Sequence, residues 1–259
     1  MARRSSAPST FLARLAECGS ASDAVWAAGM LIGIVFTLIA AYRFPYPDSP
    51  SGKFWAYAGL WVRASLYLWA GDALARRGGL VLARLLAMGL VAGVGELLVD
   101  WWLIHGVAHG RLVYLTGNDI VLLGSPIWMP LAWACVIVEL GYPALRIFAA
   151  LRARIGERVA AIAASLICAT SAGITVGFYE YFAYRAGWWK YEPARRMLGG
   201  FCALYIPLGE FLMFLVLLPI AQRAIADDQR PRAAAIEAGA MFAVAIALGY
   251  ALAYALLER

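Results

Sequence analysis

The chain has 259 residues, of which 63% are hydrophobic and 15% charged, with a mean hydropathy of +0.73. Soluble domains average about 45–50% apolar and about 25% charged residues, so this composition excludes an ordinary soluble domain and predicts a polytopic membrane protein. The net charge is +6, carried by 20 arginines and two lysines. In so apolar a chain this basic excess indicates membrane topology rather than a nucleic-acid partner.

The N-terminal segment predicts a tail. Residues 1–22 carry arginines, but no apolar core with a small-residue cleavage site follows closely. We therefore expect a cytoplasmic tail with a short amphipathic piece at residues 11–18, not a signal peptide. We expect residues 23–259 to form a single transmembrane helical domain.

Seven apolar stretches of about 20–28 residues follow, each long enough to cross a hydrocarbon core of about 30 Å. They predict an all-α protein with transmembrane helices at residues 24–43, 53–75, 80–105, 120–146, 158–185, 197–222 and 233–256. The tail and the second, fourth and sixth loops hold most of the arginines. The positive-inside rule then places the N-terminus in the cytoplasm and the C-terminus outside, and we expect a bacterial inner membrane.

Carboxylates interrupt these apolar stretches. Glu96 and Asp100 share one helix face, because they are four residues apart. Glu180 and Glu210 each lie in a later span. A carboxylate near the bilayer centre costs about 3 kcal/mol on insertion scales, so we expect all four to face one interior cavity.

Two other carboxylates can be explained without an interior site. Glu139 and Asp72 fall near the inner ends of their predicted helices, where we expect interfacial side chains. Arg63 lies inside the second span and is expected to pair with one of the carboxylates.

A repeated helical hairpin is also indicated. Three residue pairs recur at nearly equal spacing along the chain: Asp100 with Glu180, Tyr114 with Tyr191 and Pro126 with Pro207. In transporters, paired repeats enclose a site near the membrane midplane, often beside broken helices. Pro126, Pro130 and Pro207 are candidates for such breaks.

The residues that could bind a metal are few. His105 and His109 are the only histidines, and an interfacial helix end explains them better than a metal face does. The four cysteines are scattered and form no C-x-x-C pair. We therefore expect no metal and no cofactor.

Paired carboxyl groups in an apolar cavity suit proton transfer, because burial and a second carboxyl group both favour the protonated form. Aromatic residues gather in the same segments, where they either form the interfacial belt or line the cavity and stabilise a carbocation. The candidates for substrate binding are Trp128, Tyr181, Trp188, Trp189, Tyr191, Phe211 and Phe214.

A family resemblance rests on three short segments of the second half: GWWKY at residues 187–191, LG at 198–199 and IPLGEFLMF at 206–214. They resemble the membrane-integral lycopene cyclases of the small-subunit or fused type. That family has a Trp/Tyr-rich loop and a P-[IL]-E-E helix motif in repeated units. Gly209 stands where the first of the two family glutamates belongs, and the resemblance is limited to this short part of the chain.

The resemblance implies redox-neutral, proton-initiated cyclisation of an isoprenoid in the bilayer, with Glu210 in the acid or base role. Our leading hypothesis is an isoprenoid cyclase or isomerase that uses Glu210 with Asp100 or Glu180, beside Glu96. The partners expected are an apolar lipid and the bilayer, with no nucleic acid. The alternatives are a proton-coupled transporter, a lipid-binding membrane protein and a purely structural role.

Overall fold

The structure is a computed structural model that describes residues 18–44, 52–115, 117, 119–226 and 229–259. The predicted amphipathic piece at residues 11–18 lies almost wholly outside this range, as does the predicted tail up to residue 17. The helices are α2 (Ser20–Arg43), α3 (Gly52–Ala73), α4 (Gly79–His105), α5 (Met129–Ile155), α6 (Glu157–Ala186), α7 (Tyr205–Phe214), α8 (Leu217–Ala226) and α9 (Pro231–Leu257), with a 3-10 turn η1 (Ala75–Arg77). The predicted all-α fold is confirmed.

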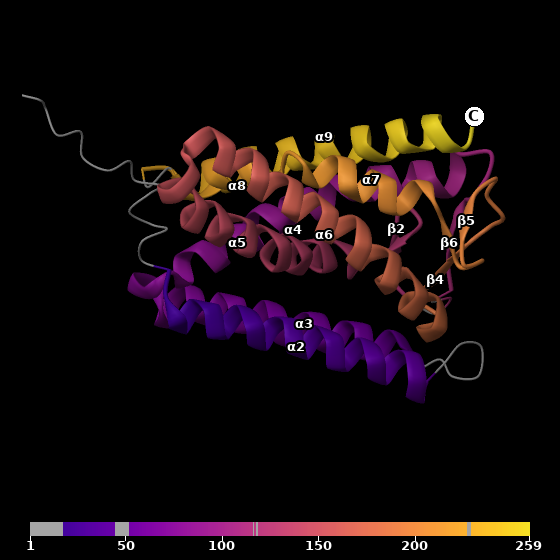
Figure 1. The fold of residues 1–259 in the computed structure, drawn as a ribbon. Helices are drawn as coiled ribbons and strands as arrows, with labels where there is room; N and C mark the ends of the chain where they lie inside the picture. The colour runs from indigo at the N-terminus through magenta and orange to yellow at the C-terminus, as the bar shows by residue number, and fades with distance from the viewer. Residues whose placement is uncertain (1–17, 45–51, 116, 118, 227–228) are drawn as a thin grey trace, which may run out of the picture.

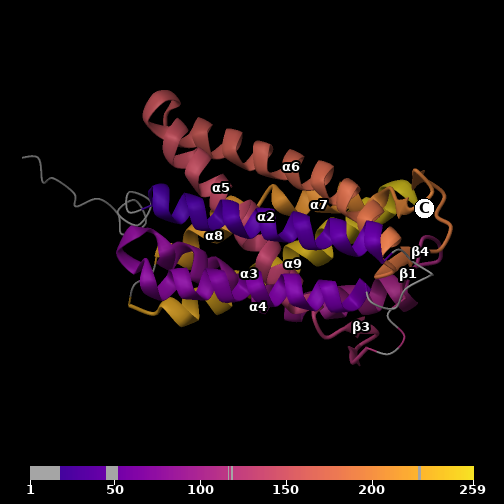
Figure 2. The ribbon, with the colours of Figure 1, turned by 90° about the horizontal axis from the view of Figure 1, so that it is seen from below.

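The helices form two groups (Figure 1). α2 and α3 lie side by side as a hairpin below the bundle of α4 to α9. In the view from below, α2 has α3 on one side and α6 on the other (Figure 2), and it packs against both. The start of α2 and the end of α9 lie at opposite ends of the molecule.

Five helices are long and apolar enough to cross a membrane, namely α2, α4, α5, α6 and α9. α7 and α8 together qualify as a sixth span that is bent by 44°. The remaining predicted span, residues 53–75, coincides with α3, which carries Lys53, Arg63 and Asp72 and is not among the helices apolar enough to cross a membrane. By length and hydropathy, the described part of the chain therefore has five or six helices that could span a membrane, instead of the seven predicted.

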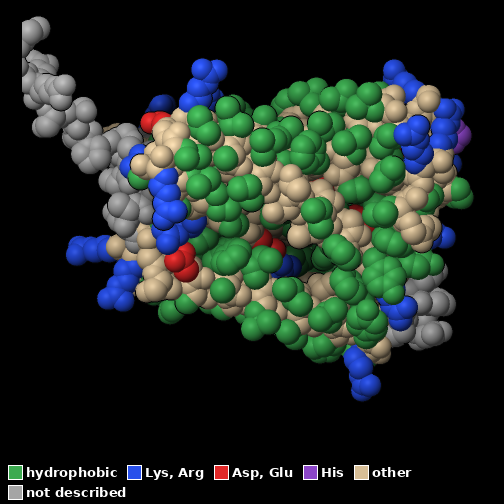
Figure 3. Space-filling view, in the orientation of Figure 1, with side chains coloured by type: hydrophobic (Ala, Val, Ile, Leu, Met, Phe, Trp, Pro, Cys, Tyr) green, Lys and Arg blue, Asp and Glu red, His purple; other side chains and the backbone are tan. Residues whose placement is uncertain are grey.

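The outer surface has the pattern of a membrane protein. Hydrophobic side chains cover the middle of the face in Figure 3, and lysines and arginines gather at its two ends. Large exposed hydrophobic residues on α2, α6 and α9 include Leu31, Phe178 and Leu248. Such a band matches the hydrocarbon core, whereas the charged ends match the headgroup regions.

Short strands occupy the end of the molecule opposite the start of α2. They are β1 (Leu112–Tyr114), β2 (Val121–Leu122), β3 (Ser125–Pro126), β4 (Trp189–Tyr191), β5 (Met197–Leu198) and β6 (Cys202–Ala203). β2 pairs with β3, β5 with β6, and β1 with β4, all antiparallel. The predicted spans 120–146 and 197–222 therefore began too early, because each starts with a hairpin that precedes the helix.

The order of elements agrees with the predicted repeat. Residues 79–155 and 157–226 each contain a helix, a strand, a two-stranded hairpin and then a second helix or bent helix pair. β2, β3 and α5 precede β5, β6 and α7 by nearly the same interval in each case. In the β1–β4 ladder Val113 is opposite Lys190, and the same interval separates these two residues, so the two units meet at equivalent positions.

Prolines do not break the helices where the sequence suggested. Pro126 lies in β3, Pro130 is the second residue of α5, and Pro207 is the third residue of α7. Pro207 therefore corresponds to Pro130 rather than to Pro126, because both lie in the first turn after a hairpin. A proline there removes a donor that has no partner within the helix anyway, so it marks a helix start. The observed bend precedes Pro219, the third residue of α8.

Candidate functional site

A cavity of about 380 Å³ lies among the helices, and its walls are mainly apolar. Side chains from α2, α3, α4, α5, α6, α7 and α9 line it, together with β1 and β4. The four carboxylates expected at the site, Glu96, Asp100, Glu180 and Glu210, all line this cavity. Each is buried, with 2–5% of its surface exposed.

Asp100 lies in the last two turns of α4 and is held by residues that follow it in the chain. Its Oδ2 atom accepts a hydrogen bond of 2.6 Å from the Ser125 hydroxyl of β3 and another from the Tyr114 hydroxyl of β1. Burial and the nearby Asp100 carboxyl group hold the pKa of Tyr114 well above its usual value, so this phenol stays a donor. The strand segment thus fixes the orientation of Asp100.

Glu96 lies one turn before Asp100 on the same face of α4. The two carboxyl groups are within hydrogen-bonding reach of each other, and such a contact needs one proton between them. The indole of Trp133 on α5 is the other polar neighbour of Glu96. Among the described residues, the buried Oε2 atom of Glu96 has no hydrogen-bond partner.

Glu180 occupies the corresponding place near the end of α6. The Trp189 indole donates a hydrogen bond of 2.6 Å to its Oε2 atom, and Tyr191 is a second polar neighbour. Burial and Glu180 hold the pKa of Tyr191 well above its usual value. Gly187 places these residues, because it ends α6 at φ +69°, where the Trp188 amide returns to the Ala183 carbonyl and the chain turns into β4.

Glu210 lies in the second turn of α7 and has a partner from outside the repeat. The Tyr250 hydroxyl of α9 donates a hydrogen bond of 2.5 Å to its Oε1 atom. Its buried Oε2 atom has no hydrogen-bond partner among the described residues. Because an unpaired buried oxygen is costly, this atom marks the place where a proton or a ligand is expected.

Gly209 explains how Tyr250 reaches this position. A side chain at residue 209 would collide with the Tyr250 ring, which packs against the glycine backbone. The absence of a side chain at residue 209 therefore lets the tyrosine from α9 contact Glu210.

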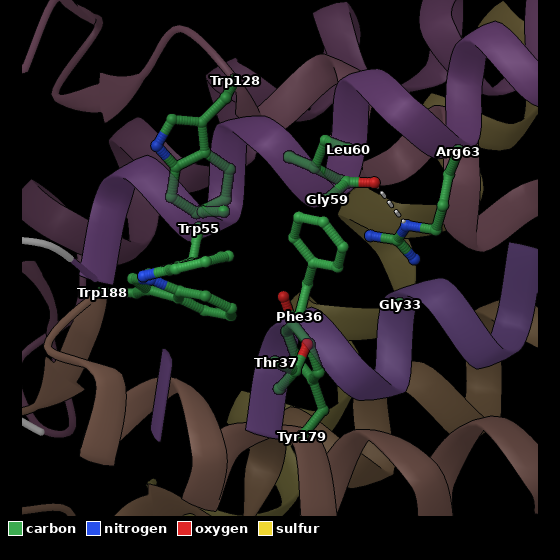
Figure 4. Close-up of a pocket in the computed structure, with 11 residues that line it drawn as sticks. Gly33, Phe36, Thr37, Trp55, Gly59, Leu60, Arg63, Trp128, Tyr179 and Trp188 are labelled. Atoms are coloured by element: carbon green, nitrogen blue, oxygen red, sulfur yellow. Dashed lines mark hydrogen bonds between the residues drawn. The ribbon is translucent and has the colours of Figure 1, made fainter. Parts of the chain in front are cut away.

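The aromatic candidates divide into two groups. Trp189 and Tyr191 line the cavity as expected. Trp128 and Trp188 instead border a narrow cleft between α2 and α3, which has room for about one water molecule (Figure 4). They do not line the cavity, because their rings pack against each other and against Trp189 behind its wall.

Three further aromatic candidates also lie outside the cavity lining. Tyr181 packs against two phenylalanine rings, while Phe214 packs against Phe242 in the core. Phe211 lies next to Gly173 of α6, where the two helices approach closely. These three residues pack against neighbouring side chains and do not line the cavity.

The position of Glu139 differs from the interfacial position expected from the sequence. It is mostly enclosed rather than interfacial, with 13% of its side chain exposed. It forms an ion pair of 2.5 Å with Arg63, the partnership that the position of Arg63 suggested. Both residues line the cavity with the four carboxylates. Asp72 is exposed, as expected for an interfacial residue.

The sequence analysis did not assign four polar groups to the site. Each of them contacts one of the carboxyl groups: Tyr114, Ser125, Trp133 and Tyr250. A tyrosine or serine inside an apolar stretch is a weak signal, because it gives no indication of which distant carboxylate it meets.

No cluster of three or more His, Cys, Asp or Glu side chains with the spacing of a metal site occurs in the described part of the chain. His105 and His109 are exposed at the end of α4 and just beyond it. The donors around the cavity are carboxyl, phenol and indole groups, which are suited to hydrogen bonding and proton transfer.

Comparison with known proteins gives a family but no activity. The family model described as "Domain of unknown function (DUF6989)" matches residues 97–257. No curated protein and no solved structure matches the chain significantly. The chain therefore belongs to the DUF6989 family, and the matched region begins inside α4, so that α2 and α3 lie before it.

Proposed function

We propose that this member of the DUF6989 family is a membrane-embedded cyclase or isomerase that transfers protons to an isoprenoid or a similar apolar lipid. The observation that carries the proposal is Glu210, whose Oε2 atom is unpaired among the described residues in the wall of an apolar cavity. The cavity volume of about 380 Å³ lies in the range of about 300–1,000 Å³ that small-molecule sites occupy.

The proton balance follows from the carboxyl groups. Glu210 gives its proton to one carbon of a substrate alkene, and the Tyr250 hydroxyl stabilises the carboxylate that remains. The resulting carbocation takes an electron pair from a second alkene, which forms the new carbon–carbon bond. Asp100 or Glu180, as the carboxylate, then accepts a proton from the product cation, so the reaction is redox-neutral. That proton must return to Glu210 to restore the acid before the next turnover.

Other features of the cavity support this chemistry. Trp189 and Tyr191 present aromatic side chains to it, and ring faces stabilise cations. The apolar walls exclude water, which would otherwise quench a carbocation. The resemblance to lycopene cyclases supports the same reaction class. We place the protein in the bacterial inner membrane, with its N-terminus in the cytoplasm and the bilayer as the source of the substrate.

The test is substitution of Glu210. Glu210→Gln keeps the shape but removes the transferable proton, so product formation should fall by about 10²-fold or more. The measurement is mass spectrometry of lipid extracts from hosts that supply candidate isoprenoids and make each variant at the same level. Glu237→Gln on the exposed face of α9 is the matched control and should leave turnover unchanged. Full activity of Glu210→Gln would contradict the proposal.

A second candidate is a proton-coupled transporter or lipid-binding protein. The 44° bend between α7 and α8 favours it, because transporters place broken helices beside their sites. The two candidates differ in a reconstitution experiment. A transporter acidifies or alkalises the lumen of proteoliposomes when substrate is added, whereas a cyclase changes the substrate without moving net protons across the bilayer.

A further inference from the structure

Arg63 is the one cationic side chain in the wall of the cavity that the structure describes. It extends from the middle of α3 toward α2 and passes beside Gly33 (Figure 4). A Cβ atom at residue 33 would lie 2.7 Å from its Nη1 atom, so this glycine makes room for the guanidinium group. Both residues belong to the α2–α3 hairpin, which precedes the region shared with the family.

Some N–H donors of the guanidinium group are not used in hydrogen bonds to the described residues. Its Nε atom donates to the Gly59 carbonyl at 3.2 Å, and its Nη1 atom donates to Glu139 at 2.5 Å. Among the described residues, Nη2 has no hydrogen-bond partner, although a guanidinium group carries five N–H donors. About 12% of the side chain remains accessible, and it borders both the cavity and the cleft.

Charge decides which acceptor suits this donor. Glu139 already neutralises Arg63, so an anionic ligand would leave one uncompensated negative charge in an apolar site. Such a charge is expensive inside a membrane, whereas a neutral oxygen adds a hydrogen bond without changing the net charge. A pure hydrocarbon would leave the donor unused. A neutral carbonyl oxygen therefore fits best.

The cavity also opens sideways. Its lining includes Ile34 and Leu38 of α2 and Thr175 and Phe178 of α6, all of which are exposed on the outer face. Figure 3 shows a hollow in the apolar surface, with acidic and basic side chains visible inside it. A lipid that lies in the bilayer can enter between α2 and α6 without crossing a headgroup region.

We propose that Arg63 binds the carbonyl oxygen of a neutral amphipathic lipid that enters between α2 and α6. The hydrocarbon chain of the ligand then lies in the same cavity as Glu96, Asp100, Glu180 and Glu210. This inference rests on the proposed function, because it assigns the ligand class for that cavity. It assigns Arg63 a binding role rather than a catalytic one.

Three lipids with the same C15 chain test the proposal: farnesene, which is a hydrocarbon, farnesal, which has a carbonyl group, and farnesoic acid, which is an anion. Binding to purified protein is measured by quenching of tryptophan fluorescence and by native mass spectrometry. The unaltered protein should bind farnesal about tenfold more tightly than farnesene or farnesoic acid, as one added hydrogen bond allows. Equal binding of the three, or binding of none, would overturn the inference.

Two variants isolate the role of Arg63. Combining Arg63→Met with Glu139→Gln removes both charges at similar volume, which buried ion pairs often tolerate. This double variant should bind farnesal and farnesene within about twofold of each other. Glu139→Gln alone leaves the arginine uncompensated and should shift the preference to farnesoic acid.

The exposed ion pair Arg111–Glu192 is the matched control. Arg111→Met with Glu192→Gln should leave the preference for farnesal unchanged. A tenfold preference for farnesal that persists in the folded Arg63→Met, Glu139→Gln protein would overturn the inference. Binding is measured without turnover, so this result and the Glu210→Gln result can fail separately.

Discussion

The two repeated units, residues 79–155 and 157–226, share an order of elements but treat their carboxyl groups differently. In the first unit, Asp100 receives two hydroxyl donors from its own unit, Tyr114 and Ser125. In the second unit, Glu210 has a single donor among the described residues, and it comes from α9. The comparison indicates that Asp100 is an oriented acceptor, whereas Glu210 keeps one carboxyl oxygen free for transfer, as Glu96 also does in the first unit.

The second helices of the two units differ as well. α5 continues through Pro143 although this proline cannot donate to the Glu139 carbonyl. The Trp26 indole of α2 donates to that carbonyl at 3.1 Å and satisfies it. In the second unit the chain bends before Pro219, and no hydrogen bond to the Leu215 carbonyl is present in the described residues. A partner from another helix therefore decides whether a proline breaks the span.

The largest expected effect in this comparison is on stability. Asp100→Ala leaves two hydroxyl groups inside the protein without an acceptor, at about 1–3 kcal/mol each. Glu180→Ala leaves one donor, the Trp189 indole, without its acceptor. The loss of stability caused by Glu180→Ala should therefore be about half that caused by Asp100→Ala. Thermal unfolding in detergent measures both. Asp100→Asn keeps an acceptor oxygen and should lie between Asp100→Ala and the parent. A larger loss for Glu180→Ala would refute the comparison.

A smaller effect concerns turnover. Tyr250→Phe removes the donor that Glu210 has in the described part of the chain. It should reduce product formation by about tenfold, since a hydrogen bond to a charged group contributes about 1.5–3 kcal/mol. Tyr114→Phe leaves Ser125 on Asp100 and should cost about threefold or less. Initial rates with one isoprenoid substrate give the comparison. If Tyr114→Phe is the more damaging change, the free acid is not in the second unit.

The smallest effect concerns the prolines. Trp26→Phe should cost about 1 kcal/mol, because the Glu139 carbonyl loses its donor. In a Pro143→Ala background the new amide supplies that donor, so the same change should cost much less. A double-mutant cycle by thermal unfolding measures the difference. Equal costs of Trp26→Phe in both backgrounds would show that the indole does not compensate for the proline.

Local features of this protein could be predicted from its sequence. The membrane class follows from composition, and the buried carboxylates follow from the cost of charge in lipid. The repeat follows from spacing, although the interval between Asp100 and Glu180 is longer than the one between the paired strands β1 and β4. The reason is that α6 ends closer to β4 than α4 does to β1.

The tertiary structure alone decided which side chains meet. Tyr250 and Glu210 are 40 residues apart, Arg63 and Glu139 are 76 apart, and Trp26 and the Glu139 carbonyl are 113 apart. Periodicity and hydropathy report the face and depth of a residue on its own helix, but a contact between helices depends on their rotation and crossing, which packing of the whole bundle sets. For that reason the four carboxylates could be predicted, and so could an ion pair between Arg63 and a carboxylate. The identity of that partner, Glu139, the donor Tyr250 and the unbroken α5 could not be predicted.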